Sequence, residues 1–150
     1  MPNNGDHVPG ADHLLRYIDK KYVDPEANQI DGSGFLARKD EEAPSANWME
    51  CFPAPTENQI AEIRGVKRIK YEKRGRLARI NVERTIQHVS ANAMAQLAFV
   101  HDKLEATDKH PPDPSHVLMR GIPKLFSSEA EFIRDLMREC ILDLFPPTPG

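Results

Sequence analysis

The sequence predicts a single α+β domain in which a small, mostly antiparallel sheet has a C-terminal amphipathic helix packed on one face. Its length of 150 residues suits one domain with a hydrophobic core. Residues 77–83 alternate between apolar and polar side chains, which is typical of a half-buried strand. Residues 128–145 instead repeat apolar side chains every three or four positions, which predicts a helix with one buried stripe.

The N-terminal part of the chain predicts short elements separated by turns. Residues 1–11 are mostly polar and are expected to form a flexible arm, and residues 14–18 fit a strand or one turn of helix. Residues 24–28 and 31–34 have the Asp, Asn, Gly and Pro composition of turns. Residues 35–37 then fit a short strand.

The first clear helix signal lies at Thr56. Pro55 precedes this residue and Gln59 follows it three positions later, as in a capping box. The helix is expected to end at Gly65, because glycine favours helix ends.

The C-terminal half predicts strands followed by a helix. Further strands are expected at residues 96–100 and 115–119. Ser128 and Glu131 fit a capping box at the start of the final helix, and Pro146 stops it. The expected organisation is therefore an arm (1–11), one domain (12–145) and a proline-rich tail (146–150).

The charge distribution is the most informative functional feature. Nine basic residues lie between Arg64 and Arg84 against only Glu72 and Glu83, a formal charge of +7, although the whole chain carries −3. Such a separation indicates a docking surface for an acidic partner or a polyanion. The residues expected to bind the partner or nucleic acid are Lys67, Arg68, Lys70, Lys73, Arg74, Arg76, Arg79 and Arg84. The pI of about 6.1 argues against a dedicated nucleic-acid-binding domain.

Composition also restricts the compartment and the cofactors. The chain has two cysteines, Cys51 and Cys140, which is too few for a disulfide scaffold and favours a reducing, cytoplasmic location. The N-terminus lacks the basic and apolar regions of a secretory signal, and no uncharged apolar stretch is long enough to span a membrane. The histidines and cysteines match no zinc signature, so no metal or other cofactor is expected.

The densest group of histidines and carboxylates lies between residues 101 and 116. If the chain is an enzyme, His116 with Asp113 or His101 is the candidate acid–base group of a phosphodiesterase or nuclease. The alternative is structural: Asp113 shapes a turn and His116 is a hydrogen-bonded residue at the rim of the sheet. A pocket containing Arg38 and Ser45 is a further possibility, but no nucleophile motif surrounds Ser45.

Two stretches carry a resemblance to known proteins. The first comprises residues 16–18, 34–38, 41 and 45–48, and the second comprises residues 113–116 and 121–123. Together they resemble a set of small uncharacterised bacterial proteins, some of them encoded near mobile-element or defence genes. The match is strongest at Arg38, Ser45, Asp113 and His116. The resemblance implies a bacterial accessory protein and carries no activity.

The sequence therefore favours a non-enzymatic interaction or regulatory module that docks a larger protein through a basic surface. Two alternatives stay open. One is a histidine-dependent or metal-assisted phosphodiesterase, and the other is a nucleic-acid-binding protein without catalysis. The oligomeric state does not follow from the sequence.

Overall fold

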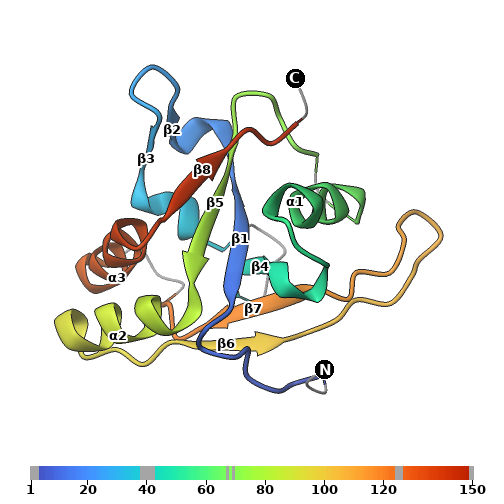
Figure 1. Cartoon of the computed structure of the whole chain (residues 1–150). Helices are drawn as coiled ribbons and strands as arrows, with labels where there is room; N and C mark the ends of the chain where they lie inside the picture. The colour runs from blue at the N-terminus through green and yellow to red at the C-terminus, as the bar shows by residue number, and fades with distance from the viewer. Residues whose placement is uncertain (1–3, 38–42, 67, 69, 124–126, 149–150) are drawn as a thin grey trace.

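A computed structural model describes residues 4–37, 43–66, 68, 70–123 and 127–148. Its centre is an antiparallel six-stranded sheet in the order β6-β7-β4-β1-β5-β8 (Figure 1). The strands are β1 (His13–Ile18), β4 (Ser45–Trp48), β5 (Arg76–Asn81), β6 (Ala98–His101), β7 (His116–Arg120) and β8 (Asp143–Phe145). A separate hairpin contains β2 (Val23–Asp24) and β3 (Gln29–Ile30). The expected α+β fold with a C-terminal helix is confirmed.

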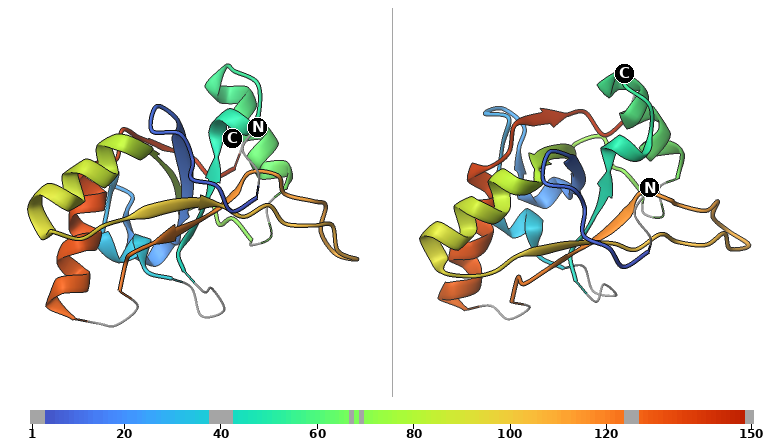
Figure 2. Two further views of the ribbon diagram at one scale, coloured as in Figure 1. Left: turned by 90° about the horizontal axis from the view of Figure 1, so that it is seen from below. Right: turned by 60° about the horizontal axis from the view of Figure 1, so that its bottom comes forward.

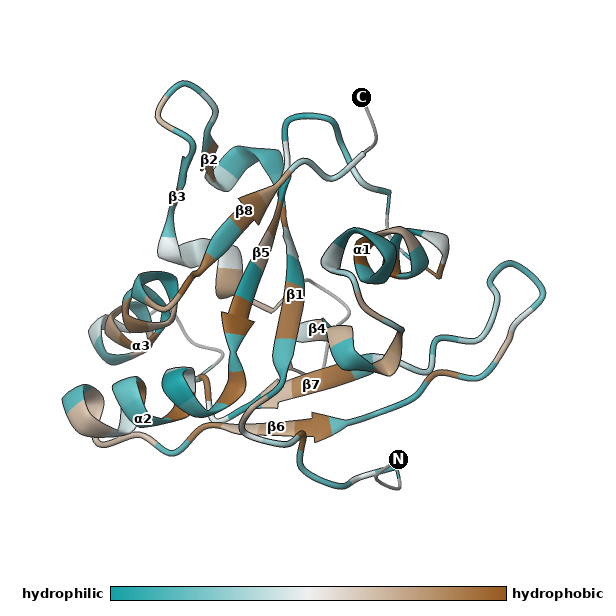
Figure 3. Ribbon diagram, viewed as in Figure 1, coloured by the Kyte–Doolittle hydropathy of each residue, from teal (hydrophilic) through white to brown (hydrophobic). Residues whose placement is uncertain are grey.

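Helices cover both faces of the sheet. They are α1 (Thr56–Gly65), α2 (Val82–Ala93) and α3 (Ser128–Glu139), with short 3-10 helices η1 (Lys20–Tyr22), η2 (Gly32–Phe35) and η3 (Met49–Cys51). Strand β1 divides the two cores, since successive side chains point to opposite faces. Leu14 and Ile18 join the larger core under α2 and α3, whereas Leu15 and Tyr17 join the smaller core under α1. Figure 3 shows the resulting hydrophobic segments along the central strands.

Several elements begin and end where the sequence indicates. Helix α1 spans the expected residues, but the expected capping box is wrong: Pro55 is the N-cap, no side chain caps the helix, and Gln59 donates to Phe52 O instead. Strand β5 matches the alternating segment except at its end. Strands β6 and β7 lie within two residues of the expected positions. Among the described residues, no helix is both long enough and apolar enough to cross a bilayer.

The expected strand at residues 77–83 ends early, because helix α2 begins at Val82. The side chain of Asn81 accepts a hydrogen bond from the backbone N–H of Arg84 at 2.9 Å and so caps the helix. Val82 and Val89 are buried against the core, whereas Glu83 and Arg84 are exposed. The last two residues of the alternating segment, Val82 and Glu83, thus belong to the first turn of α2.

The final helix is shorter than expected. Helix α3 ends at Glu139, and residues 143–145 form β8, which pairs with β5. Ser127, not Ser128, is the N-cap, and its hydroxyl accepts from the N–H of Ala130. In the sequence, apolar residues continue at helical spacing beyond Glu139. They do so because Ile141, in the loop after α3, and Leu144, in β8, contact the same core as the helix. Pairing with the open edge of β5 outweighs local helical preference there.

The segment expected as a strand at residues 35–37 is mostly the end and cap of η2. Arg16 holds this segment, since its guanidinium donates to the carbonyl oxygens of Gly34 at 2.8 Å and Leu36 at 2.8 Å. A third bond from Arg16 reaches the carbonyl oxygen of Ser45 at 2.6 Å. Arg16 therefore satisfies main-chain acceptors that a regular strand would pair with another strand.

Described residues of the N-terminal arm lie along β6. His101 O accepts from the N–H of Gly5 at 2.8 Å, and the N–H of His101 donates to Asp6 O at 2.9 Å. Val8 continues the pairing with a bond to Phe99 O at 2.9 Å. The described part of residues 1–11 thus covers one outer edge of the sheet.

Candidate functional site

The basic window does not form one continuous strip, because several of its arginines hold structural contacts. Arg68 donates to the carbonyl oxygens of Glu105 and Pro111, which lie in the long loop of residues 102–113 seen at the right of both views in Figure 2. Arg76 bonds the side chain of Asn28 at 3.0 Å and the carbonyl oxygen of Gly75 at 2.7 Å. These guanidinium groups brace loops.

Two further arginines of the window are also separated from it. Arg79 forms an ion pair with Asp143 across the β5–β8 ladder. Arg84 is exposed, but it lies on α2, away from the turn that precedes β5 (Figure 1). Lys67 lies outside the described residues, as does Arg38.

The remaining cations gather at one end of the sheet. Lys70, Lys73 and Arg74 are exposed in the turn before β5. Lys20 of η1 reaches this turn through its ion pair with Glu72, and the exposed Lys21 follows Lys20 and lies over the ring of Tyr22. We call these five residues the basic turn: Lys20, Lys21, Lys70, Lys73 and Arg74. The sequence window missed the two lysines of η1, because they are about fifty residues away along the chain and meet the window only after folding.

Aromatic packing fixes the basic turn on β1. The rings of Tyr17 and Tyr71 stack with their centroids 4.7 Å apart. The hydroxyl of Tyr17 accepts a hydrogen bond from the N–H of Glu72 at 2.9 Å. Gly75 closes the turn through a bond from its N–H to Glu72 O, and a Cβ at Gly75 would lie 2.5 Å from the ring of Tyr17. Glycine is required there because the backbone approaches the ring closely.

One carboxylate partly offsets the charge of the basic turn. Lys20 Nζ lies 2.9 Å from Glu72 Oε2. This hydrogen bond raises the pKa of Lys20 above its usual value, whereas the neighbouring charge of Arg74 lowers it. Lys20 therefore has both a carboxylate and another cation close to it. The carboxylates that act on Lys20 are Glu72 and Asp19, so the five cations of the basic turn outnumber these two acids.

The two candidate histidines do not converge. His101 pairs with Val117 in the β6–β7 ladder, so its side chain points to the same face as Val117. His116 is adjacent to Val117 in β7 and therefore points to the opposite face. His101 is 4% exposed, packs edge-on against Trp48, and donates from Nε2 to Pro114 O at 2.7 Å.

Asp113 is buried in a hydrogen-bonded network of its own. Its Oδ1 accepts from the backbone N–H and the hydroxyl of Ser115, at 2.9 Å and 2.7 Å. Its Oδ2 accepts from Nδ2 of Asn47 at 2.9 Å. These bonds shape the turn that leads into β7. This is the structural alternative that the sequence suggested for Asp113.

The partner of His116 is Asp102. Nδ1 of His116 lies 2.9 Å from the carbonyl oxygen of Asp102 and 3.2 Å from its carboxylate oxygen Oδ2. This orients the ring and leaves Nε2 on the side away from Asp102. Ser45 lies on the same face of the sheet, two residues before Asn47, which pairs with His116. The carbonyl oxygen of Ser45 accepts from Arg16.

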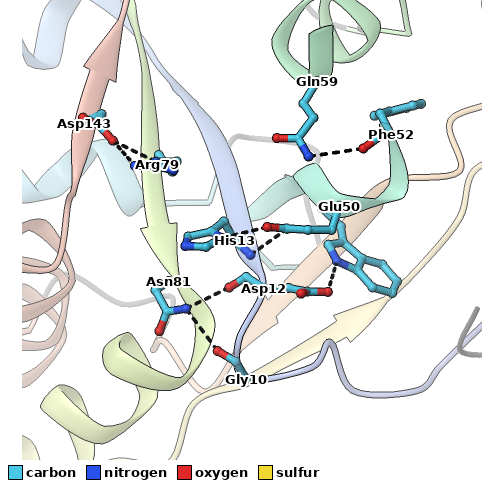
Figure 4. A network of polar contacts seen from close by, with 10 residues as sticks. Gly10, Asp12, His13, Glu50, Phe52, Gln59, Arg79, Asn81 and Asp143 are labelled. Carbon is cyan, nitrogen blue, oxygen red and sulfur yellow. Dashed lines mark hydrogen bonds and ion pairs between the residues drawn. The ribbon is translucent and has the colours of Figure 1, made fainter. Parts of the chain in front are cut away.

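Another polar network joins β1 to its neighbours (Figure 4). Glu50 accepts from the backbone N–H of His13 at 2.8 Å and contacts its Nδ1 at 2.7 Å. Asp12 accepts from the indole N–H of Trp48 at 2.8 Å. Asn81 donates to the carbonyl oxygens of Gly10 and Asp12 at 3.1 Å each. These bonds position the start of β1.

The environment of the two cysteines keeps their thiols protonated rather than activating them. Burial, followed by the charges of Asp113, Asp12 and Glu50, raises the pKa of Cys51 to about 12, so its thiol is protonated at neutral pH. Burial also raises the pKa of Cys140. Within the described ranges, no three His, Cys, Asp or Glu side chains gather in a metal-binding arrangement.

Comparisons with protein-family models, with curated proteins and with solved structures found no match to this chain.

Proposed function

We propose that this chain is a non-enzymatic interaction module that docks a larger, acidic protein through the basic turn. The supporting observation is that exposed cations from two distant segments meet at one end of the sheet, where Lys20 forms an ion pair with Glu72 beside Lys73 and Arg74. Tyr17 and Gly75 fix the backbone of this turn, so the positions from which its charged side chains project are set before a partner arrives. Preorganised charges speed encounter and favour a complementary partner.

The proposal extends to the setting of the protein. The resemblance in residues 16–48 and 113–123 suggests a cytoplasmic bacterial accessory protein, so we propose that its partner belongs to a bacterial system, such as a defence system. The acidic body of the chain, with its net charge of −3, favours an acidic protein surface over nucleic acid as the occupant of the basic turn.

The test is capture of the native partner from an extract of the source cells. The variant Lys70→Glu/Lys73→Glu/Arg74→Glu reverses three exposed charges of the basic turn. A control, Arg84→Glu/Lys103→Glu/Lys109→Glu, makes the same change in net charge at exposed positions elsewhere. We expect the wild type and the control to retain the partner and the basic-turn variant to lose it. Equal capture by both variants would refute the proposal.

A second candidate function is acid–base catalysis on a phosphodiester, and the oriented pair of His116 and Asp102 is the observation that favours it. A carbonyl or carboxylate on Nδ1 fixes the tautomer and presents Nε2 for proton transfer. His116→Ala should then abolish nuclease or phosphodiesterase activity. His101 lies on the other face of the sheet, so His101→Ala should leave proton transfer by His116 intact. Activity that survives His116→Ala, or no activity in the wild type, removes this candidate.

A further inference from the structure

The two outer edges of the sheet are treated differently. The N-terminal arm pairs with β6 through Gly5, Asp6 and Val8 and so covers that edge. At the other edge, β8 pairs with β5, and no described segment pairs with its outer side. An open strand edge presents unpaired N–H and C=O groups and is a template for another strand.

A groove runs beside this open edge. It has a volume of about 300 Å³ and is lined by Asn28, Gln29, Ile30, Arg138, Ile141 and Leu144. Its walls are therefore β3, the end of α3 and β8, which lie close together at the left of Figure 1. Three aliphatic side chains form its apolar part, and two amides supply hydrogen-bonding groups.

Both cations and carboxylates lie around the groove: Arg138 is in its lining, Asp24 pairs with Gln29, and Asp31 follows Ile30. The hydrogen bond from Ser33 lowers the pKa of Asp31, and the charge of nearby Arg138 lowers it further. Arg138 is exposed at the end of α3 and is the one ionisable residue among the described residues that line the groove. Strand β8 runs from there toward the basic turn, because Phe145 pairs with Leu77, two residues after Gly75. Arg76 links the two regions through its bonds to Asn28 in the groove and to Gly75.

We infer that this groove binds an extended acidic segment of the partner, which adds a strand to the open edge of β8. The segment places an aliphatic side chain between Ile30, Ile141 and Leu144, and its acidic residues lie near Arg138 at one end and near the basic turn at the other. Main-chain pairing supplies affinity, and the pocket and charges supply specificity. The acidic character of the segment rests on the proposed docking function.

The geometry limits the added strand to a short one. Strand β8 has three residues and is followed by Pro146 and Pro147, which cannot donate main-chain hydrogen bonds. A volume of about 300 Å³ accommodates one or two aliphatic side chains. The recognised segment is therefore a few residues long, with aliphatic residues in the middle and acidic residues on both sides.

A defined peptide tests the inference. The probe is a fluorescein-labelled heptapeptide, Glu-Glu-Leu-Val-Leu-Glu-Glu, and its binding to the full chain is measured by fluorescence anisotropy. A second probe carries N-methyl groups on its central residues, which removes main-chain donors and keeps charge and side chains. We expect N-methylation to weaken binding by about tenfold or more, because strand pairing depends on these donors.

Protein variants distinguish the groove from the general charge of the surface. Arg138→Glu should weaken binding of the first probe by about tenfold or more, whereas Lys109→Glu, an equal charge change at a distant exposed loop, should change it by less than about twofold. Amide hydrogen exchange at residues 143–145 should slow when the probe binds. Exchange that stays unchanged, or affinity unaffected by N-methylation and by Arg138→Glu, overturns the inference.

The outcomes separate this inference from the proposed function. If the basic-turn variant loses the native partner but Arg138→Glu retains it fully, docking through the basic turn stands and the groove has no part in it. If Arg138→Glu loses the partner and the basic-turn variant retains it, the groove stands and the basic turn does not. Absence of binding of the first probe to the wild type overturns the groove inference alone.

Discussion

Arg79 donates its Nε–H to Asp143 Oδ2 at 2.8 Å, directly across the ladder that joins β5 to β8. The pair ties the C-terminal strand to the sheet and neutralises one of the cations in the basic window. It shows why charge along the sequence overstates the size of the docking surface. In the folded chain, neighbouring residues of the same chain neutralise part of the charge of a basic segment.

We expect Asp143→Ala to lower the free energy of unfolding by less than about 1 kcal/mol, because the pair is only partly buried. Urea denaturation monitored by circular dichroism measures this change. Capture of the native partner should be unaffected, since Arg79 is outside the basic turn. If capture is lost while stability is unchanged, the Arg79–Asp143 pair takes part in docking, which would contradict this prediction.

The two buried arginines should respond oppositely to substitution. Arg16 is 2% exposed and donates to three carbonyl oxygens. Its replacement by Met leaves these acceptors without their donor, so Arg16→Met should lower the free energy of unfolding by roughly 3–5 kcal/mol. Denaturant unfolding measures the loss, and a change below about 1 kcal/mol would contradict this role for Arg16.

Arg134 is 1% exposed, its Nε and Nη1 have no hydrogen-bond partner among the described residues, and its charge acts on the carboxylate of Asp31. A buried guanidinium in this state retains the cost of desolvation. Arg134→Met should therefore raise the free energy of unfolding by roughly 1–4 kcal/mol. The control Arg134→Lys keeps a buried charge and should give no gain. A destabilised Met variant would show that the guanidinium is stabilised in the folded chain.

The thiol of Cys51 should react slowly at neutral and mildly alkaline pH. Its pKa is raised to about 12, mainly by burial, and only the thiolate is alkylated. Iodoacetamide labelling followed by mass spectrometry should show much slower reaction in the folded chain than in urea, with the rate rising toward pH 12. Rapid labelling of Cys51 near pH 8 would contradict the raised pKa.

The same pKa has a consequence for stability. The folded chain holds the Cys51 proton more tightly than the unfolded chain, whose ordinary pKa is near 9.0. The contribution of the protonated thiol is complete below that value and is lost as the pH rises from there toward about 12. The stability difference between wild type and Cys51→Ala should therefore shift against the wild type in this alkaline range.

Local patterns in the sequence predicted elements whose signals lie within a few residues. The Pro55 and Gly65 boundaries of α1 and the alternation in β5 are of this kind. Helix α2 and strand β8 were missed, because their identity depends on the cap at Asn81 and on pairing with β5. Apolar residues at helical spacing contact a core equally well from a helix or from a following strand.

The candidate site was predicted only in part for the same reason. Lys70, Lys73 and Arg74 were identified from the charge of one segment, but their association with Lys20 and Lys21 depends on the contact between η1 and the turn before β5. His101 and His116 point to opposite faces because His101 pairs with Val117, one residue after His116, in the β6–β7 ladder. Residue type and proximity in sequence do not specify that register.

The salt dependence of affinity for the captured partner tests docking through the basic turn most directly. We expect the dissociation constant of the wild type to rise by about tenfold or more between about 0.05 M and about 0.5 M NaCl, since exposed charges are screened over this range. The variant Lys70→Glu/Lys73→Glu/Arg74→Glu should bind weakly at low salt and lose this dependence, while Arg84→Glu/Lys103→Glu/Lys109→Glu should behave like the wild type. Equal affinities and equal salt slopes in all three proteins would contradict the account.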